Sequence, residues 1–368
     1  MKPLLKWPGG KAKEIAQVYG MIPDYDRYIE PFFGGGALFF HLSPERAAIN
    51  DTAGDLMEFY HLVQVQDEQF RQALYSYAES FRGILEYGRL HVTELLDVWS
   101  LLPNKEDAAD SLQLLMEVWM PEILAMFSYP IVLDEGKFQK ELEDSLLDKL
   151  CRTRENHRKN PFSPEDLAEN LVTGLTSGYY LYFRSVYNDW NLGRITLPAG
   201  LRAANFFFIR ETCYGSMFRY NRNGEFNIPY GGMSYNKKDF TGKVDALFRE
   251  ETQKIFAGTD IRCMDFEDFL AQIQPTEHDF MFLDPPYDTE FSDYEGTAFT
   301  KLDQARLAVC LSKTKAKFLL IIKNTPYIES LYSQGFYIKR FDKQYTYNVR
   351  SRNDRAAEHL IVTNYPFE

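Results

Sequence analysis

Two groups of strand-like segments stand at opposite ends of the 368-residue chain, and a long helical pattern separates them. In residues 27–60, a strand RYIEPF precedes a glycine turn and a helix, and a second strand RAAIND precedes an amphipathic helix. After residue 245 the segments DIRCMD, DFMFLD, AKFLLIIKN, FYIKRF and EHLIVTNY read as strands with helical stretches between them. Alternating strands and helices are typical of α/β proteins. The pattern therefore predicts one α/β domain whose sequence is interrupted.

The interrupting segment differs in composition from both ends. Its Leu, Trp and Met residues recur at helical spacing, which predicts helices with an apolar core face. Residues 104–170 hold 15 acidic and 8 basic residues, so this part carries much of the net charge of −12. We predict a split α/β domain at 1–65 and 245–368, with an inserted, mostly helical domain at 66–244. The insert includes an unusual acidic stretch at 78–176.

Composition excludes several classes of protein. No apolar stretch approaches the roughly 20 residues that a membrane span needs. The N-terminal MKPLLKWPGGK has neither the long apolar core nor the cleavage site of a signal peptide. We therefore expect a soluble, cytoplasmic protein without a membrane partner. The four cysteines are scattered, which predicts reduced, mostly buried thiols rather than disulfides or a zinc site: Cys151, Cys213, Cys263 and Cys310.

The acidic isoelectric point near 5.1 argues against a protein that coats nucleic acid without specificity. The basic residues are nevertheless grouped rather than spread evenly. One group is Lys339, Arg340, Lys343, Arg350, Arg352 and Arg355, and a second is Arg210, Arg219 and Arg222. A basic groove on an acidic protein is therefore compatible with the sequence.

A glycine turn joins the first predicted strand to its helix in YIEPFFGGGALFF. Glycines at such a turn let a ligand approach the backbone closely, because no Cβ intervenes; they are Gly34, Gly35 and Gly36. Asp51 closes the next strand, where an acid can accept hydrogen bonds from ribose hydroxyls. Asp265 closes a third candidate strand and could accept from an adenine amino group, with Phe266 packing on the ring. Acids that close successive strands favour an adenosine-containing ligand over tight packing alone.

The strand DFMFL ends in the motif formed by Asp284, Pro285, Pro286 and Tyr287. The amino nitrogen of adenine is a poor nucleophile, because its lone pair is delocalised into the ring. Two acceptors, the Asp284 carboxylate and the Pro285 carbonyl, could draw that nitrogen toward tetrahedral geometry, and proline fixes the backbone between them. Tyr287 could stack on a base that has left the duplex. The alternatives are an ordinary Pro-Pro turn and, less favoured without a neighbouring histidine or acid pair, a metal ligand.

Motifs at both ends of the chain resemble the Dam-type, or alpha-group, DNA N6-adenine methyltransferases. In the predicted α/β domain they are LKWPGGK (5–11), EPFFGGGALF (30–39), AIND (48–51), CMDF (263–266), DPPY (284–287) and FSDYEGTAFTKLDQARLA (291–308). In the insert they are YYLYFRSVYN (179–188) and CYGSMFRYNRNGEFNIPYG (213–231). The order of these motifs along the chain matches that of the family. The acidic stretch has no counterpart in the resemblance.

The resemblance implies a Rossmann-like methyltransferase domain with an inserted helical DNA-recognition domain. It implies transfer of a methyl group from S-adenosylmethionine to adenine N6 in a specific double-stranded sequence, with S-adenosylhomocysteine as the product and no metal. It further implies a bacterial or phage-encoded protein that is monomeric in solution, with a cognate restriction endonuclease as a candidate partner. The residue types alone leave two alternatives open, which are methylation of an amine in RNA and a binding module without turnover.

The resemblance also implies roles for individual residues. The cofactor would be bound by Trp7, Lys11, Phe32, Gly34, Gly35, Gly36, Asp51, Asp265, Phe266 and Asp284. The flipped adenine would meet Asp284, Pro285, Pro286 and Tyr287. DNA would be contacted by Lys6, Tyr214, Met217, Arg219, Asn221, Arg222, Pro229, Arg350 and Arg352. Among these, Arg219 would read a guanine edge and Tyr214 would insert into the vacated stack.

Several of these roles have alternatives. Arg219 or Arg222 could instead contact a phosphate or form a salt bridge, and Asn221 could simply hold its loop. The sequence also departs from family members that read GATC. Gly215 stands where those members often carry Asn or Ser, and Met233 stands where a tyrosine or arginine helps to read the first base. The recognition sequence is therefore left open.

Overall fold

The computed structural model describes residues 1–7, 15–102, 104–286, 299–344 and 356–367. Contacts between Cα atoms divide the chain into two compact units. The unit that we call the sheet unit comprises Met1–Pro3, Trp7–His61 and Glu250–Glu368. The unit that we call the helical unit comprises Leu4–Lys6 and Leu62–Arg249.

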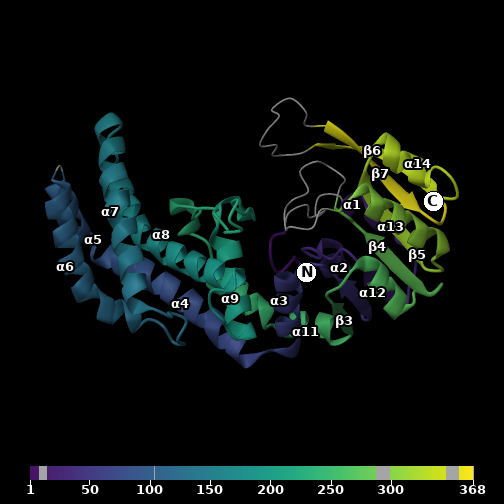
Figure 1. The fold of residues 1–368 in the computed structure, drawn as a ribbon, viewed down its shortest axis with the longest axis horizontal. Coiled ribbons are helices and arrows are strands. Elements are labelled where there is room, and N and C mark those ends of the chain that lie inside the picture. Colours follow the sequence, from purple (N-terminus) through teal and green to yellow (C-terminus); the bar gives the residue numbers. More distant parts are fainter. Residues whose placement is uncertain (8–14, 103, 287–298, 345–355, 368) are drawn as a thin grey trace. The chain divides into compact units, whose positions relative to one another are not determined.

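Within the described part of the chain, seven strands form one sheet in the order β3-β2-β1-β4-β5-β7-β6 (Figure 1). The strands β1 to β5 run parallel, and β7 runs antiparallel to both of its neighbours. The strands are β1 (Arg27–Glu30), β2 (Ala47–Asn50), β3 (Thr259–Arg262), β4 (Asp279–Leu283), β5 (Lys317–Lys323), β6 (Tyr337–Gln344) and β7 (Ala356–Thr363). Each strand that the sequence predicts is confirmed, and the fold class is α/β with a mixed sheet.

The helical unit contains long helices whose bounds are α4 (Glu68–Leu90), α5 (Val92–Leu101), α6 (Lys105–Leu124), α7 (Glu135–Lys159), α8 (Pro164–Asn191), α9 (Ala199–Thr212) and α10 (Phe240–Leu247), with short 3₁₀ turns η2 (Tyr214–Ser216) and η3 (Met233–Tyr235). Asp67, Asp134 and Ser163 begin α4, α7 and α8 by accepting a hydrogen bond from a backbone N–H of the first turn. No helix in the described residues is long and apolar enough to cross a membrane.

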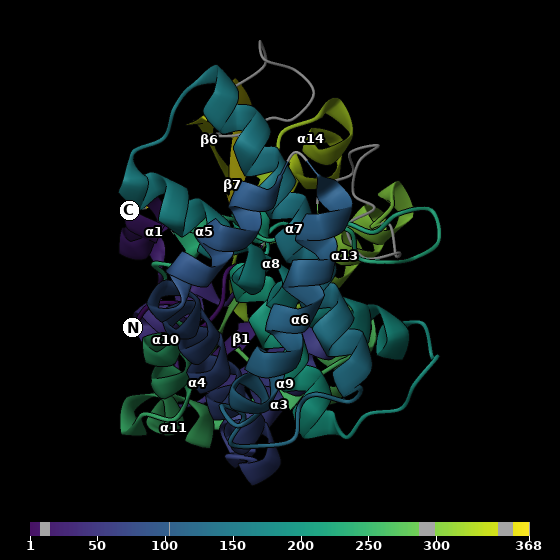
Figure 2. The ribbon, with the colours of Figure 1, turned by 90° about the vertical axis from the view of Figure 1, so that its left-hand side faces the viewer.

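The helices α7 and α8 lie side by side along much of their length (Figure 2). Gly178 permits this approach, because a Cβ at that position would lie 2.8 Å from the Leu142 Cα. Phe138 of α7 is fully buried and packs edge-on against Tyr182 of α8, with ring centroids 5.0 Å apart. Edge-to-face aromatic pairs add to the stabilisation from apolar burial. The two helices therefore form one tightly packed layer.

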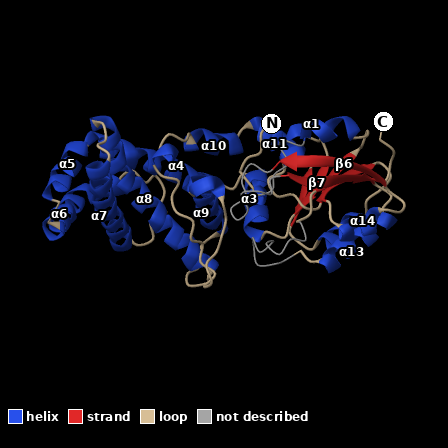
Figure 3. Cartoon of the chain, turned by 90° about the horizontal axis from the view of Figure 1, so that it is seen from above, coloured by secondary structure: helices blue, strands red, loops and turns tan. Residues whose placement is uncertain are grey.

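Helices cover both faces of the sheet (Figure 3). On one face α12 (Phe266–Ile273), α13 (Lys301–Lys313) and α14 (Pro326–Tyr332) bury Phe269, Leu311 and Ile328 against β4 and β5. The other helices and turn of this unit are α1 (Ile15–Val18), η1 (Tyr19–Met21), α2 (Ala37–Leu42), α3 (Gly54–Val65), which ends in the helical unit, and α11 (Glu250–Ala257). On the opposite face Phe39 of α2 packs between Tyr28 of β1 and Phe256 of α11.

Coverage of both faces explains the apolar runs in the central strands. Every residue of β4 is buried, as expected for a parallel strand between two helical layers. The strand β3, at the edge of the sheet, alternates between buried and exposed residues.

The four cysteines are free thiols, but the prediction that they are mostly buried is wrong. Only Cys213 is buried, and Cys151 and Cys310 are half-buried. Cys263 is exposed, because it follows the edge strand β3, where no further strand covers it.

Candidate functional site

The order of the parallel strands places a candidate site at one edge of the sheet. The chain passes from β1 to β2 and β3 on one side, and from β4 to β5 on the other, so β1 and β4 flank the point where the order reverses. Ligands of such sheets bind beyond the carboxyl ends of the strands at this point. Glu30 ends β1, while Asp51 and Asp284 directly follow β2 and β4. Three carboxyl groups therefore gather at this edge.

Asp51 holds the glycine turn in place. Its Oδ2 accepts a hydrogen bond from the Gly34 N–H at 2.8 Å, and its Oδ1 accepts from the Ala53 N–H at 3.0 Å. Burial raises the pKa of the Asp51 carboxyl, while the bonds from Gly34 and Ala53 act in the opposite direction. A carboxylate offers about four acceptor sites, so bonds to a ribose can be added to these two.

The backbone of the turn requires glycine at two positions. Gly34 has φ of +49°, and a Cβ there would lie 2.9 Å from Cδ1 of the Trp7 indole. Gly36 has φ of +61°, and its Cβ would lie 2.4 Å from the Phe33 ring. Side chains larger than hydrogen are therefore excluded, which keeps the turn open beside Trp7.

Glu30 is a site residue that the sequence interpretation missed. It is only 3% exposed, and its Oε2 accepts a hydrogen bond from the Tyr28 hydroxyl at 2.8 Å. Burial raises the pKa of Glu30 well above its usual range, and the charges of Asp284 and Asp51 add to the rise. The neutral form of Glu30 is therefore favoured by its surroundings. The sequence did offer a signal for Glu30, because an acidic residue in a strand that is expected to be buried is unusual.

Asp265 begins α12 rather than closing β3. Its Oδ1 accepts a hydrogen bond from the Glu267 N–H at 2.9 Å, which makes Asp265 the helix cap. Arg306 of α13 also binds this carboxylate, with Nη2 2.6 Å from Oδ1. The same guanidinium contacts Glu267 and Asp303, and these acids raise its pKa. Arg306 is a second residue that the sequence interpretation missed.

Phe32 and Phe266 form an apolar wall next to these acids. Their ring centroids are 5.5 Å apart, and Phe299 packs against both rings. Arg306 lies over the Phe266 ring, with its guanidinium carbon 4.9 Å from the ring centroid. The predicted cofactor residues at this end of the sheet are therefore brought together as an apolar wall with acids at its margin.

The bend after β4 carries the predicted catalytic residues. Asp284 is half-buried, Pro285 is buried and Pro286 is exposed. The bend is held from α13, where Gln304 is fully buried and donates its Nε2 hydrogen to the Pro286 carbonyl oxygen at 3.0 Å. Gln304 lies in one of the motifs that carry the family resemblance, but the sequence interpretation assigned it no role.

Replacing Gln304 tests whether this contact matters for catalysis. Gln304→Leu removes the donor to Pro286 and keeps an apolar group of similar size in a fully buried position. Because one hydrogen bond contributes about 1 kcal/mol, we expect kcat to fall roughly fivefold. Thermal stability should be retained, because no group in the described residues donates a hydrogen bond to the buried Gln304 Oε1. Steady-state kinetics at saturating DNA and cofactor measure the effect. An unchanged kcat would contradict a positioning role.

Several predicted DNA-binding residues lie together on the helical unit. Tyr214 is 49% exposed and begins η2, and Arg219, Arg222 and Pro229 are also exposed. The Tyr214 N–H donates to the Pro229 carbonyl oxygen at 2.9 Å, which joins the two ends of this region. Half-buried Met217 follows directly after η2.

The Asn221 side chain forms hydrogen bonds within its own loop, and its contact with DNA stays a prediction. Its Oδ1 accepts from the backbone N–H groups of Asn223 and Glu225, and its Nδ2 donates to Glu225 Oε2 at 3.1 Å. Asn227 holds the Arg219 side chain in place, because its Oδ1 accepts a hydrogen bond from Arg219 Nε at 3.4 Å. These contacts order the residues of the 219–227 loop around Arg219 and Arg222.

Lys6 lines an open pocket of about 450 Å³ in the helical unit. Three other basic residues line the same pocket, namely Lys238, Lys243 and Arg249. The Lys238 ammonium lies 3.2 Å from the centroid of the Tyr235 ring and donates to the Glu211 carbonyl oxygen. Burial lowers the pKa of Lys238 to about 8. The sequence interpretation included only Lys6 of this set.

Four predicted site residues lie outside the described residues: Lys11, Tyr287, Arg350 and Arg352. Their roles stay predictions.

Comparison with known proteins supports an assignment of the whole chain. The sequence pattern of the D12 class of N6 adenine-specific DNA methyltransferases matches residues 7–114 and 150–347. The chain is 25% identical to the type II methyltransferase M.CviBI of Paramecium bursaria Chlorella virus NC1A, over 99% of this chain and 100% of that protein. It is 26% identical to the type II methyltransferase M.MjaIII of Methanocaldococcus jannaschii, over 99% of each protein.

A further relative is the DNA adenine methylase of Escherichia coli strain K12, which is 21% identical over 83% of this chain and 74% of that protein. The family match covers most of the chain and spans the glycine turn, the Asp284 bend and the 219–227 loop. The chain therefore belongs to the D12 class of N6 adenine-specific DNA methyltransferases, and it is a site-specific enzyme that methylates adenine N6 in DNA.

Proposed function

We propose that the enzyme methylates an adenine that has left a DNA duplex, and that the bend at Asp284 is the place of transfer. The observation that carries this proposal is the position of Asp284 and Pro285 directly after β4, beside the point where the strand order reverses. Half-buried Asp284 is accessible to a base that enters from outside the sheet edge. An adenine inside a duplex cannot reach such a bend, so it has to be extruded.

S-adenosylmethionine is the cofactor that we propose for this site. When bound, it supplies an electrophilic methyl group. Asp51 and the Gly34 turn would hold its ribose and amino-acid parts, and Phe32 with Phe266 would line its adenine. The glycine turn supports this fit, because a Cβ at Gly34 would fill the space beside Trp7. No metal is needed for this chemistry.

The chain's own residues would act on the adenine amino group. Ionised Asp284 and the carbonyl oxygen of Pro285 would each accept a hydrogen bond from it, which localises the nitrogen lone pair. Asp284 can also accept the proton that the nitrogen loses after transfer. Burial raises the pKa of Glu30 well above its usual range, which favours its neutral form and so lessens the negative charge beside Asp284. The repulsion between the carboxyl groups at the strand ends is thereby reduced.

Sequence selectivity would come from the exposed residues of the helical unit. We propose that Arg219 pairs with the O6 and N7 atoms of a guanine, which is the commonest specific contact of arginine. Met217 and Pro229 would meet a thymine methyl group, and Tyr214 would enter the stack that the adenine leaves. The exposure of Tyr214, Arg219 and Pro229 supports these roles.

A labelling experiment tests the proposed reaction. The protein is incubated with S-adenosylmethionine labelled in the methyl group and with unmethylated bacterial DNA, and a parallel sample contains RNA. We expect label in N6-methyladenine of the double-stranded DNA alone. Label in RNA would favour the second candidate substrate, and cofactor binding without label in either polymer would indicate a binding module.

The pocket at Lys6 predicts a pH dependence of DNA binding. We propose that Lys238 contacts a DNA phosphate from this pocket. Because its pKa is about 8, Lys238 is charged below that pH and loses its charge as the pH rises. The plot of log K for DNA binding against the logarithm of the salt concentration should therefore become shallower between pH 7 and pH 9. The change corresponds to the release of about one counterion fewer. Fluorescence anisotropy with a cognate duplex measures this slope.

Two variants separate Lys238 from general effects of pH. In Lys238→Met the difference in salt slope between pH 7 and pH 9 should disappear. Lys237→Met removes an exposed neighbouring charge and should leave that difference intact. A wild-type slope that does not change with pH would refute the phosphate contact.

The biological setting is a separate proposal. Two relatives, M.CviBI and M.MjaIII, are named type II methyltransferases, which supports a cognate restriction endonuclease as a partner of this enzyme. Mapping the modified adenines in a host that expresses the gene gives the recognition sequence. Protection of that sequence from a neighbouring nuclease would support the partnership, and modification without any such nuclease would count against it.

A further inference from the structure

Residues 115–149 form a segment that the family pattern leaves unmatched. The segment includes the second half of α6 and the first part of α7, and it lies inside the acidic stretch of the insert. Nothing in the proposed reaction uses this segment. Within the helical unit, a series of side-chain contacts connects α7 of this segment to the 219–227 loop.

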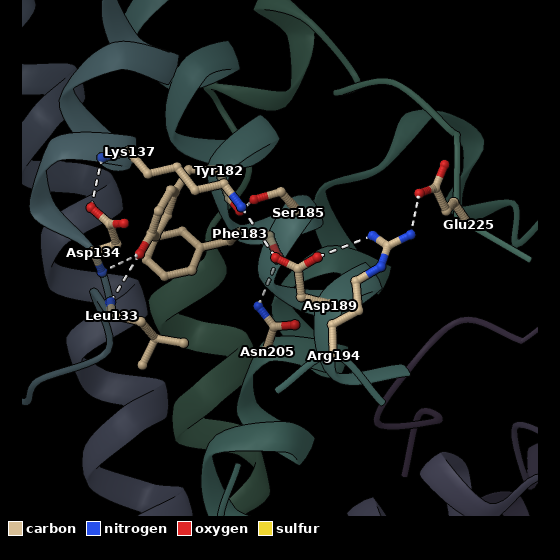
Figure 4. A network of polar contacts seen from close by, with 10 residues as sticks. All are labelled: Leu133, Asp134, Lys137, Tyr182, Phe183, Ser185, Asp189, Arg194, Asn205 and Glu225. Carbon is tan, nitrogen blue, oxygen red and sulfur yellow. Dashed lines mark hydrogen bonds and ion pairs between the residues drawn. The ribbon is translucent and has the colours of Figure 1, made fainter. Parts of the chain in front are cut away.

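The start of α7 is fixed to α8. The Tyr182 hydroxyl oxygen of α8 accepts hydrogen bonds from the backbone N–H groups of Leu133 and Asp134, at 2.8 and 3.0 Å. Asp134 in turn caps α7 by accepting from the Lys137 N–H at 2.8 Å. Figure 4 shows Lys137 extending from this first turn along α8 toward Asp189. The backbone from which the Lys137 side chain extends is therefore fixed to α8.

Lys137 begins a chain of alternating charges. Its Nζ lies 3.1 Å from Asp189 Oδ2, close to the end of α8. Asp189 Oδ1 lies 3.1 Å from Nη1 of Arg194, and Arg194 Nη2 lies 3.0 Å from Glu225 Oε1 (Figure 4). Asp189 thus lies between two cations, and Arg194 joins it to Glu225.

The last member of the chain lies in the 219–227 loop. Glu225 Oε2 accepts from the Asn221 side chain at 3.1 Å, and Arg194 and Asn221 lower the pKa of the Glu225 carboxyl. The Asn188 side chain of α8 exchanges two hydrogen bonds with the backbone of Phe226, at 2.7 and 3.1 Å. The loop is thus held by neutral bonds at Phe226 and by the charged chain at Glu225.

We propose that the 115–149 segment is a brace for the DNA-reading loop, and that Lys137 acts through Asp189, Arg194 and Glu225 to position it. Lys137 and Arg194 are positioning residues in this proposal and need no contact with DNA. The proposal rests on the proposed role of Arg219 in reading DNA, because that residue belongs to the same loop. It assigns a function to a part of the insert that the family pattern does not include.

The charges in the chain are partly exposed, with Lys137 42% and Arg194 52% exposed in their side chains. Ion pairs of this kind contribute little to stability, since water screens them. Their expected effect is on the position of Glu225 in the 219–227 loop, where Arg194 binds it. Removal of Lys137 should therefore alter DNA recognition while leaving the folded state nearly as stable as before.

A matched pair of lysine variants tests the brace. Lys137→Met should raise KM for cognate DNA by about threefold to fivefold, with kcat and the melting temperature nearly unchanged. Lys140→Met removes the same charge from the same helix, but the ion pair that Lys140 forms among the described residues is with Asp144 of that helix. It should leave KM close to the wild-type value, so a general loss of positive charge is controlled for. Lys137→Arg should restore the wild-type KM.

A double-mutant cycle completes the test. If the charges act in one chain, Arg194→Gln in the Lys137→Met background should raise KM by less than it does in the wild type. Equal KM values for Lys137→Met and Lys140→Met, or fully additive effects in the cycle, would overturn the brace. Failure of the wild-type protein to methylate DNA would instead refute the proposed function, so the two failures are distinguishable.

Discussion

Asp284→Ala is expected to abolish methyl transfer while leaving the binding of S-adenosylmethionine nearly intact. The carboxylate would act on the adenine amino group most strongly in the transition state, so its loss should appear in kcat. Removing one such electrostatic contact lowers kcat by about 10²–10³-fold in other enzymes, and Asp284→Ala also removes the proton acceptor. Single-turnover methylation of a cognate duplex measures the rate, and isothermal titration with the cofactor measures its affinity.

Asp284→Asn is the control for the shape of the bend. It keeps the size of the side chain and one acceptor oxygen, but it has no negative charge. We expect a rate between those of the wild type and Asp284→Ala, because the amide oxygen can still accept one hydrogen bond. A wild-type rate in Asp284→Ala would show that Asp284 has no role in catalysis. A large loss of cofactor affinity in both variants would assign it to binding instead.

Arg219→Ala is expected to relax selectivity at one base pair of the recognition sequence. A bidentate contact between arginine and guanine contributes about 1–3 kcal/mol of discrimination against the wrong base, so the preference should fall by about 5-fold to 150-fold. Asn227 orients the Arg219 side chain by accepting from Nε, which leaves the terminal nitrogens as the fork for guanine. Methylation rates on a set of duplexes with single substitutions measure the effect.

Arg222→Ala is the matched variant, because Arg222 is exposed on the same loop. If Arg222 contacts a phosphate, its loss should weaken binding to every duplex by a similar factor and reduce the salt dependence by about one ion. The same uniform loss in Arg219→Ala would identify Arg219 as a second phosphate contact. If the base preference changes in Arg222→Ala and not in Arg219→Ala, Arg222 is the residue that reads the base.

The strands were predictable because the central part of a parallel sheet carries its signal in short runs of sequence. DFMFL and AKFLLIIKN are continuous apolar runs, and they form β4 and β5 between two helical layers. The glycine turn was also predictable, since Gly34 and Gly36 adopt positive φ values that few other residues tolerate. The order of the motifs along the chain was enough to indicate the family.

The partners of each site residue were not predictable, because they come from distant parts of the chain. Gln304 reaches Pro286 from α13, and Arg306 reaches Asp265 across 41 residues of sequence. Glu30 gave a weak signal, and its raised pKa depends on burial and on two carboxyl groups that follow other strands. Such contacts depend on which strands become neighbours.

The sequence by itself determined the α/β class, the place of the glycine turn and the acids that follow β2 and β4, because these depend on local periodicity and on residues with restricted backbones. Only the tertiary structure decided that β1 and β4 are adjacent, which brings Glu30 to the same edge as Asp51 and Asp284. It also decided that Lys137 meets Asp189. The physical reason is that strand order and helix packing are set by burial across the whole chain, while a sequence pattern records only the neighbours of each residue along it.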